Sequence, residues 1–353
     1  MVDENLLKFA IIGMGHIGKR HAELIRRNEA CELVAVCDCK TQEEVGLTDI
    51  KESYYTSIDE LLKNEVNLID VINICVPNGL HFSYSMKALE HKKHVVIEKP
   101  MALSKADAEK IIFKSLDVSK HVFCVMQNRY SPPSEWLKEV VDQKLLGSIY
   151  VVQLNCYWNR DDRYYKPGNW HGTADMDGGV LFTQFSHFID IMYWLFGDIE
   201  NIRADFKDFC HQQSTAFEDS GFVSFDFVNG GKGLLNYSTA IWNQNLESSI
   251  TIIGEKGTLK VAGQYMNEVV YCDIKDYVMP ELAPSNPPND YGLYKGSAQN
   301  HHYVIENVVD KLCKDKSIST NALEGLKVVE IIERIYALRD KSLLKDEPKF
   351  IKD

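Results

Sequence analysis

The amino-acid sequence predicts a doubly wound parallel α/β domain followed by a largely antiparallel α+β domain. Up to about residue 127, short apolar runs alternate with helical stretches, which is typical of parallel strands joined by helices. Beyond that point, longer segments alternate polar and apolar residues and are separated by hairpin-type turns at 229–231 (NGG) and 255–257 (EKG). We therefore expect a first domain over residues 1–127 and a second over residues 128–353.

The elements of the first domain follow from local patterns. Ser104 begins a helix, because Asp107 three residues later completes a start that resembles a capping box. Pro132 and Pro133 open the helix that leads into the second domain, and Gly147 ends that region. Apolar runs predict five strands, at 9–12, 32–38, 70–77, 94–100 and 121–127.

The second domain combines strands with buried and amphipathic helices. The segment 177–197 is apolar on nearly every face and predicts a buried helix of about seventeen residues. Residues 279–292 contain four of the ten prolines and predict an irregular loop. Two helical stretches, 300–312 and 322–340, complete the chain. Strands are expected at 148–159, 217–230, 231–243, 248–263 and 268–274.

The first strand runs directly into a glycine-rich turn that predicts dinucleotide binding. Glycines at this spacing permit a tight turn, let the backbone approach a pyrophosphate and place it at a helix N-terminus. Asp38 lies twenty residues past the turn, where its carboxylate can accept hydrogen bonds from ribose hydroxyls and would repel a 2′-phosphate. We therefore expect NAD as the cofactor rather than NADP. The turn residues expected to contact it are Gly13, Gly15, His16, Ile17 and Gly18.

Composition and charge exclude several classes of partner. The net charge of −12 argues against a nucleic-acid partner, because affinity for phosphate backbones depends on clustered Lys and Arg. Without an apolar run of about eighteen residues or a basic leader, we expect a cytoplasmic location and no membrane association. The nine cysteines form no CxxC pair, and His301 and His302 point to different faces of a helix, so no metal is expected.

Polar residues lie where the predicted parallel strands end, which is where doubly wound sheets bind ligands. Lys99 follows one such strand, and Pro100 restricts it to an extended conformation and allows a cis peptide bond. Lys99 is either a catalytic or substrate-binding group, or a solvated lysine that ends a strand. The end of the preceding strand offers either cofactor contacts or an ordinary turn at Asn73, Pro77, Asn78 and His81.

Polar residues also interrupt the apolar helix predicted at 177–197. Thr183, His187 and Asp190 are spaced i, i+4, i+7 and lie on one stripe of a helix, with Gln184 beside it. Buried polar groups need partners, and a cleft for cofactor and substrate can provide them. His187 is therefore either a catalytic group or a core histidine, whereas Asp190 is expected to hold a neighbouring group.

The segment YWNRDDRYYKPGNWHGT combines aromatic residues with arginines. Arg160 and Arg163 could bind a carboxylate or a phosphate, and the aromatic rings could stack on a sugar. The alternative is a surface loop packed by its own rings, with the arginines paired to Asp161 and Asp162. Arg129, just after the first domain, is a further candidate for an anionic substrate.

Five motifs share the order and spacing of a known family: GMGHIG at 13–18, VCD at 36–38, CVPNGLH at 75–81, EKP at 98–100 and GGVLFTQFSHFID at 178–190. The sequence thus resembles the Gfo/Idh/MocA oxidoreductases of sugars and cyclitols. The resemblance implies a Rossmann domain followed by an α+β domain with a large open, mainly antiparallel sheet that usually mediates dimer or tetramer formation. It implies Lys99 and His187 as the catalytic pair, one taking the hydroxyl proton and the other stabilising the oxygen. Further cofactor contacts are implied at Asp38, Cys75, Pro77, Asn78, His81, Glu98, Lys99 and Gln127.

One position narrows the implied substrate. Many family members carry Asp where this sequence has Thr183, whereas a sub-branch acting on UDP-N-acetylglucosaminuronate at C3 resembles it at Gln184, Trp170 and 172–173. Thr183 itself matches neither pattern. The resemblance implies hydride transfer at a sugar hydroxyl carbon, C3 of a nucleotide-linked uronic acid. A free sugar or cyclitol dehydrogenase and a catalytically silent sugar- or dinucleotide-sensing regulator are the alternatives. Substrate contacts are expected at Lys99, Arg129, Arg160, Arg163, Trp170, Thr183, Gln184 and His187.

Overall fold

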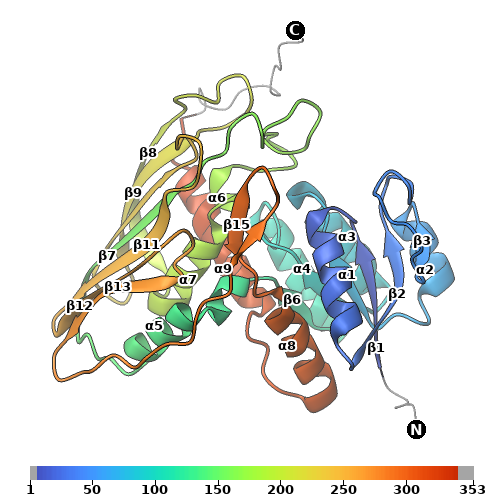
Figure 1. Cartoon of the computed structure of the whole chain (residues 1–353), viewed down its shortest axis with the longest axis horizontal. Coiled ribbons are helices and arrows are strands. Elements are labelled where there is room, and N and C mark those ends of the chain that lie inside the picture. The colour runs from blue at the N-terminus through green and yellow to red at the C-terminus, as the bar shows by residue number, and fades with distance from the viewer. Residues whose placement is uncertain (1–5, 341–353) are drawn as a thin grey trace. The chain divides into compact units, whose positions relative to one another are not determined.

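The computed structural model describes residues 6–340, which form two compact units (Figure 1). The first unit comprises the chain up to Met126 together with His301–Leu326, and the second comprises Gln127–Asn300 together with the chain from Lys327. This division differs from the expected ranges in residues 301–326, because α8 (His301–Lys314) packs against α1 (His16–Arg27). The expected ranges also include residues 1–5 and 341–353, which lie outside the described residues.

A six-stranded parallel sheet with the order β3-β2-β1-β4-β5-β6 forms the centre of the first unit. The strand order reverses between β1 and β4, which is the point where doubly wound sheets bind ligands. Every residue of β4 is buried, as expected for a sheet covered on both faces. The doubly wound fold is thus confirmed. The strands are β1 (Leu7–Ile12), β2 (Cys31–Cys37), β3 (Ser53–Tyr55), β4 (Val71–Ile74), β5 (His94–Ile97) and β6 (Val122–Cys124).

The helices of the first unit start and pack as their sequences dictate. The Ser104 hydroxyl oxygen accepts the Asp107 amide at 3.1 Å, so the predicted cap of α4 is confirmed. A Cβ on Gly325 would lie 2.4 Å from the Cys124 sulfur, so glycine lets the start of α9 (Ala322–Tyr336) approach β6 closely. The other helices are α2 (Ile58–Glu65), η1 (Asn78–Leu80), α3 (His81–Glu90) and α4 (Lys105–Asp117).

A seven-stranded sheet forms the second unit, with the order β13-β12-β11-β7-β10-β9-β8. Its neighbouring strands are antiparallel except β7 and β10, which pair in parallel, so the expected mainly antiparallel sheet is confirmed. A hairpin of β14 (Pro288–Asp290) and β15 (Lys295–Ala298) also forms, and β14 lies within the segment expected to be an irregular loop. The large strands are β7 (Ile149–Tyr157), β8 (Ile199–Lys207), β9 (Ser220–Phe227), β10 (Lys232–Ser238), β11 (Glu247–Gly254), β12 (Gly257–Ala262) and β13 (Glu268–Ile274).

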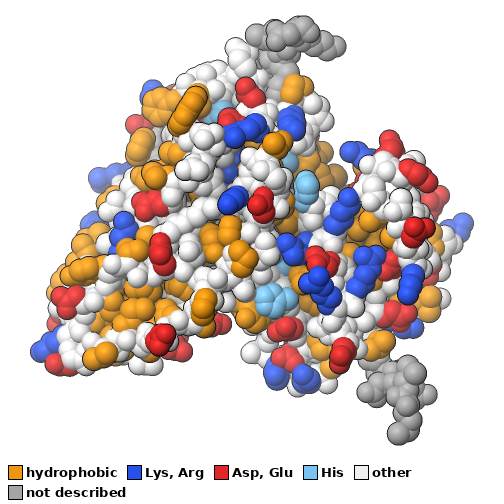
Figure 2. Space-filling view, in the orientation of Figure 1, with side chains coloured by type: hydrophobic (Ala, Val, Ile, Leu, Met, Phe, Trp, Pro, Cys, Tyr) orange, Lys and Arg blue, Asp and Glu red, His pale blue; other side chains and the backbone are white. Residues whose placement is uncertain are grey.

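Helices of the second unit cover one face of this sheet (Figure 1). On α7 (Ser186–Phe196), the Phe188 ring lies 5.6 Å from that of Trp158, and the Phe196 ring lies 5.2 Å from that of Phe227. Hydrophobic side chains lie among polar ones on the face that Figure 2 shows. Phe222, on β9, is 51% exposed. The other helices of this unit are η2 (Gln127–Tyr130), α5 (Pro132–Asp142) and α6 (Val180–Thr183).

The single buried helix predicted at 177–197 is wrong in one respect, because the chain forms two helices there. α6 ends at Thr183 and α7 begins at Ser186. Side chains at the break bind groups outside the two helices: the Thr183 hydroxyl donates to Asp177, and the Gln184 carboxamide binds Arg160 and Tyr164. The expected stripe of Thr183, His187 and Asp190 is therefore not continuous, although all three residues are buried.

None of the helices formed by residues 6–340 is long and apolar enough to cross a membrane.

Candidate active site

The three glycines of the turn after β1 have different structural roles. Gly13 has a φ of +93°, and a Cβ there would lie 2.4 Å from the Cys75 carbonyl oxygen. A Cβ on Gly18 would lie 1.8 Å from the Gly13 carbonyl oxygen, so α1 can approach the turn only with glycine at that position. Around Gly15, by contrast, no atom lies within 4 Å of the corresponding position. The first and third glycines therefore satisfy the protein's own packing, and the second leaves open space.

This open space lies at the start of α1. Gly15 is the N-cap residue, and no side chain caps the helix there. A helix N-terminus with a glycine N-cap and open space beside it fits a pyrophosphate group. The turn therefore has the shape and the donors that NAD requires, while His16 and Ile17 form the first residues of the helix.

Asp38 is fixed beside the same turn. Its Oδ2 accepts the Met14 amide at 2.7 Å, and its Oδ1 accepts the Lys40 amide at 3.0 Å. Each carboxylate oxygen has two lone pairs, so further hydrogen bonds from ribose hydroxyls remain possible. The geometry fits the expected ribose contact, since the carboxylate is oriented by the turn that would hold the pyrophosphate.

At the carboxyl edge of β4, His81 connects two neighbouring loops. Its Nδ1 lies 2.6 Å from the Pro100 carbonyl oxygen, and its Nε2 lies 2.9 Å from the Val76 carbonyl oxygen. Burial lowers the pKa of His81, although both carbonyls oppose that shift. Both ring nitrogens of His81 thus contact the protein itself, which favours a structural role over the expected cofactor contact. Pro77 precedes η1 and Asn78 begins it, so these two residues do form a turn.

Lys99 lies two residues after the end of β5, directly after Glu98, and it is half-buried. Its backbone amide donates to Glu98 Oε2 at 3.2 Å, and the Lys99–Pro100 peptide bond is cis. The cis bond that the sequence allowed is therefore present. Lys99 and the glycine turn belong to the same unit and to the carboxyl edge of the same sheet.

In the second unit, His187 lies on the first turn of α7 and is 2% exposed. The Gln127 Nε2 lies 3.2 Å from the His187 Nε2. Because a carboxamide nitrogen is a hydrogen-bond donor, the facing ring nitrogen is an acceptor, which is the form that a proton-accepting histidine needs. The structure thus brings together His187, proposed from the sequence as a catalytic residue, and Gln127, proposed as a cofactor contact.

Asp190 holds α7 through a buried ion pair with Arg129. The Arg129 Nε donates to Asp190 Oδ2 at 2.7 Å, and its second contact to Oδ1 is 2.5 Å. The structural role expected for Asp190 agrees with this contact. For Arg129, in contrast, the ion pair means that its charge already has a carboxylate partner within the protein.

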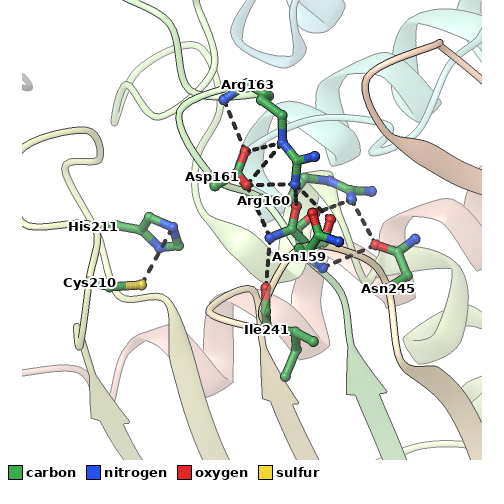
Figure 3. Close-up of polar contacts among 9 residues, drawn as sticks. Asn159, Arg160, Asp161, Arg163, Cys210, His211, Ile241 and Asn245 are labelled. Atoms are coloured by element: carbon green, nitrogen blue, oxygen red, sulfur yellow. Dashed lines mark hydrogen bonds and ion pairs between the residues drawn. The ribbon is translucent and has the colours of Figure 1, made fainter.

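The other two candidate arginines are also engaged by the protein (Figure 3). Arg160 is 2% exposed and donates to the Gln184 carboxamide at 2.6 Å and to the carbonyl oxygens of Asn159 and Lys295. Burial lowers the pKa of the Arg160 guanidinium. Arg163 binds Asp161 through two nitrogens, at 2.7 to 3.0 Å. The pairing of Arg163 with Asp161 is the alternative left open by the sequence.

The aromatic residues of the same segment contact one another. The Trp170 and His171 rings stack at 3.9 Å, and the Tyr164 ring lies 4.2 Å from that of His171 and 4.9 Å from that of Tyr294. Gln184 also joins this group, because its carboxamide nitrogen donates to the Tyr164 hydroxyl at 2.7 Å. Trp170 is half-buried, so part of its ring faces solvent.

Two buried residues escaped the sequence-based search. Asp177 accepts the Gly172 amide at 2.8 Å and receives the Thr183 hydroxyl, so it connects the aromatic segment to α6. His21 lies on α1 and contacts Glu98 at 2.9 Å. Its only sequence signal was a histidine one turn after Gly18, on the face of α1 that also buries Ile25.

Comparison with known proteins agrees with this geometry. Residues 7–124 match the profile described as the oxidoreductase family with an NAD-binding Rossmann fold, and residues 135–260 match the Gfo/Idh/MocA C-terminal domain. Among curated relatives, the D-glucoside 3-dehydrogenase of Escherichia coli K12 is 27% identical over 253 residues, which are 67% of this chain and 71% of that protein.

Two solved structures resemble nearly the whole chain. One is the WlbA dehydrogenase from Bordetella pertussis in complex with NADH and UDP-GlcNAcA, with 27% identity, a TM-score of 0.80 and coverage of 94% of this chain and 96% of that one. The other is the WlbA dehydrogenase from Chromobacterium violaceum with the same two ligands, with 28% identity, a TM-score of 0.82 and coverage of 96% and 94%. The glycine turn, Asp38 and the two domain matches lead to one conclusion: the chain belongs to the Gfo/Idh/MocA family, and it is an NAD-dependent oxidoreductase of the type that acts on the CH–OH groups of sugars and cyclitols.

Proposed function

We propose that this enzyme transfers hydride reversibly between NAD and C3 of a nucleotide-linked uronic acid, UDP-N-acetylglucosaminuronate (UDP-GlcNAcA) or a close analogue. The observation that carries the proposal is the similarity to two WlbA dehydrogenases with bound UDP-GlcNAcA, over at least 94% of each chain. Two residues that fit this sub-branch, Gln184 and Trp170, also belong to one group of contacting side chains in the second unit.

NAD, when bound, supplies the acceptor for the hydride. His187 takes the proton of the reacting hydroxyl at its Nε2, once the substrate hydroxyl has replaced the Gln127 amide that contacts this nitrogen. Lys99 donates a hydrogen bond to the same oxygen and stabilises the negative charge that develops there. Both groups are needed, because an alcohol carbon gives up hydride more readily when its hydroxyl proton is removed and the charge on its oxygen is stabilised.

The three arginines no longer support the expected preference for an anionic sugar. Arg129, Arg160 and Arg163 all bind other groups of the protein, so their presence does not by itself predict capture of a carboxylate or phosphate. The expected preference rests on the similarity to the WlbA dehydrogenases.

We also propose a homo-oligomer in the cytoplasm. The uncovered face of the large sheet exposes Phe222, Leu234 and Ile253, and exposed apolar side chains on one sheet face are typical of a protein interface. None of the nine cysteines, all within the described residues, forms a disulfide, which agrees with a reducing compartment.

A substrate panel tests the proposed function. Purified enzyme is assayed with NAD and, in parallel, UDP-GlcNAcA, UDP-N-acetylglucosamine, free glucose and myo-inositol, with NADH absorbance as the readout. We expect UDP-GlcNAcA to give the highest kcat/KM, at least about tenfold above UDP-N-acetylglucosamine, which lacks the carboxylate, because one charge-assisted contact contributes about 1.5–3 kcal/mol. Faster turnover of glucose or inositol would contradict the nucleotide-sugar proposal and leave only the family assignment. A His91→Gln variant, changed on an exposed helix end, is the control for preparation quality.

A further inference from the structure

A cluster of buried polar side chains surrounds the end of β5 in the first unit. His21 comes from α1, Asn73 from β4 and His301 from the first residue of α8, while Glu98 directly follows β5. Their exposed fractions are 1%, 0%, 2% and 7%. Burying polar groups this deeply costs folding free energy unless they are paired. The proposed hydride transfer assigns no role to this cluster.

Glu98 is the centre of this cluster. Its Oε1 lies 2.9 Å from the His21 Nε2 and 3.6 Å from the His301 Nε2. Its Oε2 accepts the backbone amide of Lys99 at 3.2 Å. The carboxylate thus connects two histidines from distant parts of the chain with the amide of the residue proposed to contact the substrate.

The charges in the cluster agree with this geometry. Burial alone would raise the pKa of Glu98, but the hydrogen bond from His21 and the charges of His301, His21 and Lys99 hold it at about 2. Burial likewise opposes protonation of His21, yet Cys75 and Glu98 raise its pKa to about 10. Burial lowers the pKa of His301 to about 4. Around neutral pH the Glu98 carboxylate is therefore ionised and His301 is neutral.

The backbone on either side of Lys99 is held as well. The Glu98 amide donates to the Ile74 carbonyl at 3.1 Å, which extends the sheet by one residue. On the other side, the Pro100 carbonyl oxygen lies 2.6 Å from the His81 Nδ1. The backbone is therefore held on both sides of Lys99.

We propose that Glu98, held by His21, is a positioning residue for Lys99. Its carboxylate anchors the Lys99 amide and so fixes the point and the direction from which the lysine side chain leaves the edge of the sheet. The inference rests on the proposed role of Lys99 in the reaction. It goes beyond that role, because Glu98 and His21 act through Lys99 and not on the substrate.

A metal ion is the other occupant that two histidines and a carboxylate could hold. Ligands of one tetrahedral zinc, with bonds of about 2.0–2.1 Å, lie about 3.3 Å apart. The His21–Glu98 distance of 2.9 Å is instead that of a charge-assisted hydrogen bond, and the His21 Nδ1 contacts Asn73 at 2.8 Å. The distances therefore favour a hydrogen bond between His21 and Glu98 over a shared metal ion.

A double-mutant cycle separates positioning from general stabilisation. Glu98→Gln offers one acceptor oxygen where the carboxylate offers two, so it cannot serve both His21 and the Lys99 amide. With NAD and UDP-GlcNAcA we expect Glu98→Gln to lower kcat about 10- to 100-fold and to leave the KM for NAD within threefold, since small misplacements of a reacting group cost up to about 100-fold. In a Lys99→Ala background the same change should have no further effect. A loss of equal size in both backgrounds would overturn the proposal.

The matched control is Glu52→Gln. Glu52 pairs with Arg26 at 2.7 and 2.9 Å in the same unit, but it precedes β3, so it lies at the opposite edge of the parallel sheet. Its replacement should leave kcat within twofold of the wild type. A drop like that of Glu98→Gln would mean that any lost ion pair in this unit impairs turnover.

A second readout does not depend on turnover. Hydrogen exchange of the Lys99 amide, measured by mass spectrometry, should be at least tenfold faster in Glu98→Gln than in the wild type, and unchanged in Glu52→Gln. Unchanged exchange in Glu98→Gln would overturn the anchoring role, whatever the kinetics show. If Lys99→Ala alone retains wild-type turnover, the proposed function fails, while the exchange experiment still decides whether Glu98 anchors the amide. Zinc that stays bound through dialysis against EDTA, and that His301→Gln loses, would overturn the assignment of a His21–Glu98 hydrogen bond.

Discussion

Replacing Asp190 by Asn tests whether a buried ion pair holds the helix that carries His187. Arg129 and Asp190 contact each other at 2.7 and 2.5 Å, and their side chains are 3% and 1% exposed. Removing one charge from such a buried pair costs about 3–5 kcal/mol, because the partner's charge stays buried. The surface pair of Arg163 and Asp161 has similar chemistry, but its side chains are 39% and 41% exposed. Asp161→Asn should therefore cost no more than about 1 kcal/mol.

Urea unfolding followed by tryptophan fluorescence measures both variants. All five tryptophans lie between Gln127 and Asn300, so the signal reports the second unit alone. We expect the free energy of unfolding to fall by at least about 3 kcal/mol in Asp190→Asn and by under about 1 kcal/mol in Asp161→Asn. The double variant Arg129→Met, Asp190→Leu should recover much of the loss, since apolar side chains of similar volume can replace a buried pair. Equal losses in the two single variants would refute the reasoning from burial.

Four further predictions concern the cofactor, the catalytic pair and the pH response. Gly15→Ala should leave the melting temperature unchanged and weaken NAD binding at least tenfold by titration, because the added methyl group would fill space that is open in the protein and that NAD would use. Equal NAD affinity would show that Gly15 does not contact the cofactor. NAD should bind at least tenfold more tightly than NADP, a difference of about 1.4 kcal/mol, and Asp38→Ser should reduce that ratio; tighter NADP binding by the wild type would contradict the role of the carboxylate. Lys99→Ala and His187→Ala should each lower turnover about 100-fold or more and leave NAD affinity within a few-fold, whereas lost NAD binding would indicate structural roles. The folded protein holds the pKa of His301 at about 4, below its unfolded value near 6.5. The free energy of unfolding should therefore decrease as the pH falls from 6.5 toward 4, and His301→Gln should recover about 2 kcal/mol of this loss at pH 5. Identical pH profiles of stability for the wild type and the variant would contradict this prediction.

Local sequence patterns predicted most of the fold, and they failed where distant side chains decide the structure. The alternation of apolar strands and helices correctly gave the parallel sheet, and polar–apolar alternation gave the second sheet. The break between α6 and α7 could not be read from an apolar run, because it depends on bonds from Gln184 to Arg160 and from Thr183 to Asp177. The pattern of α8 likewise shows an amphipathic helix but not that the helix packs against α1.

The candidate site shows the same limit at the level of single residues. Residue type marked Arg129 as a group suited to an anionic substrate, whereas in the folded chain it binds the Asp190 carboxylate. The glycine motif treats its three glycines alike, whereas the structure separates Gly13 and Gly18, which satisfy packing, from Gly15, which leaves open space. Sequence spacing thus identified the groups capable of chemistry, and packing determines which of them are still available to a ligand.

Isotope transfer from a substrate labelled at one carbon tests the central claim most directly. UDP-GlcNAcA with deuterium at C3 is incubated with the enzyme and NAD, and the reduced cofactor is analysed by mass spectrometry. We expect one deuterium in each reduced cofactor, together with a slower rate than with the unlabelled sugar, because the C3–H bond is the one that breaks. Reduced cofactor without deuterium would show that hydride leaves from another carbon and would contradict the proposed C3 chemistry.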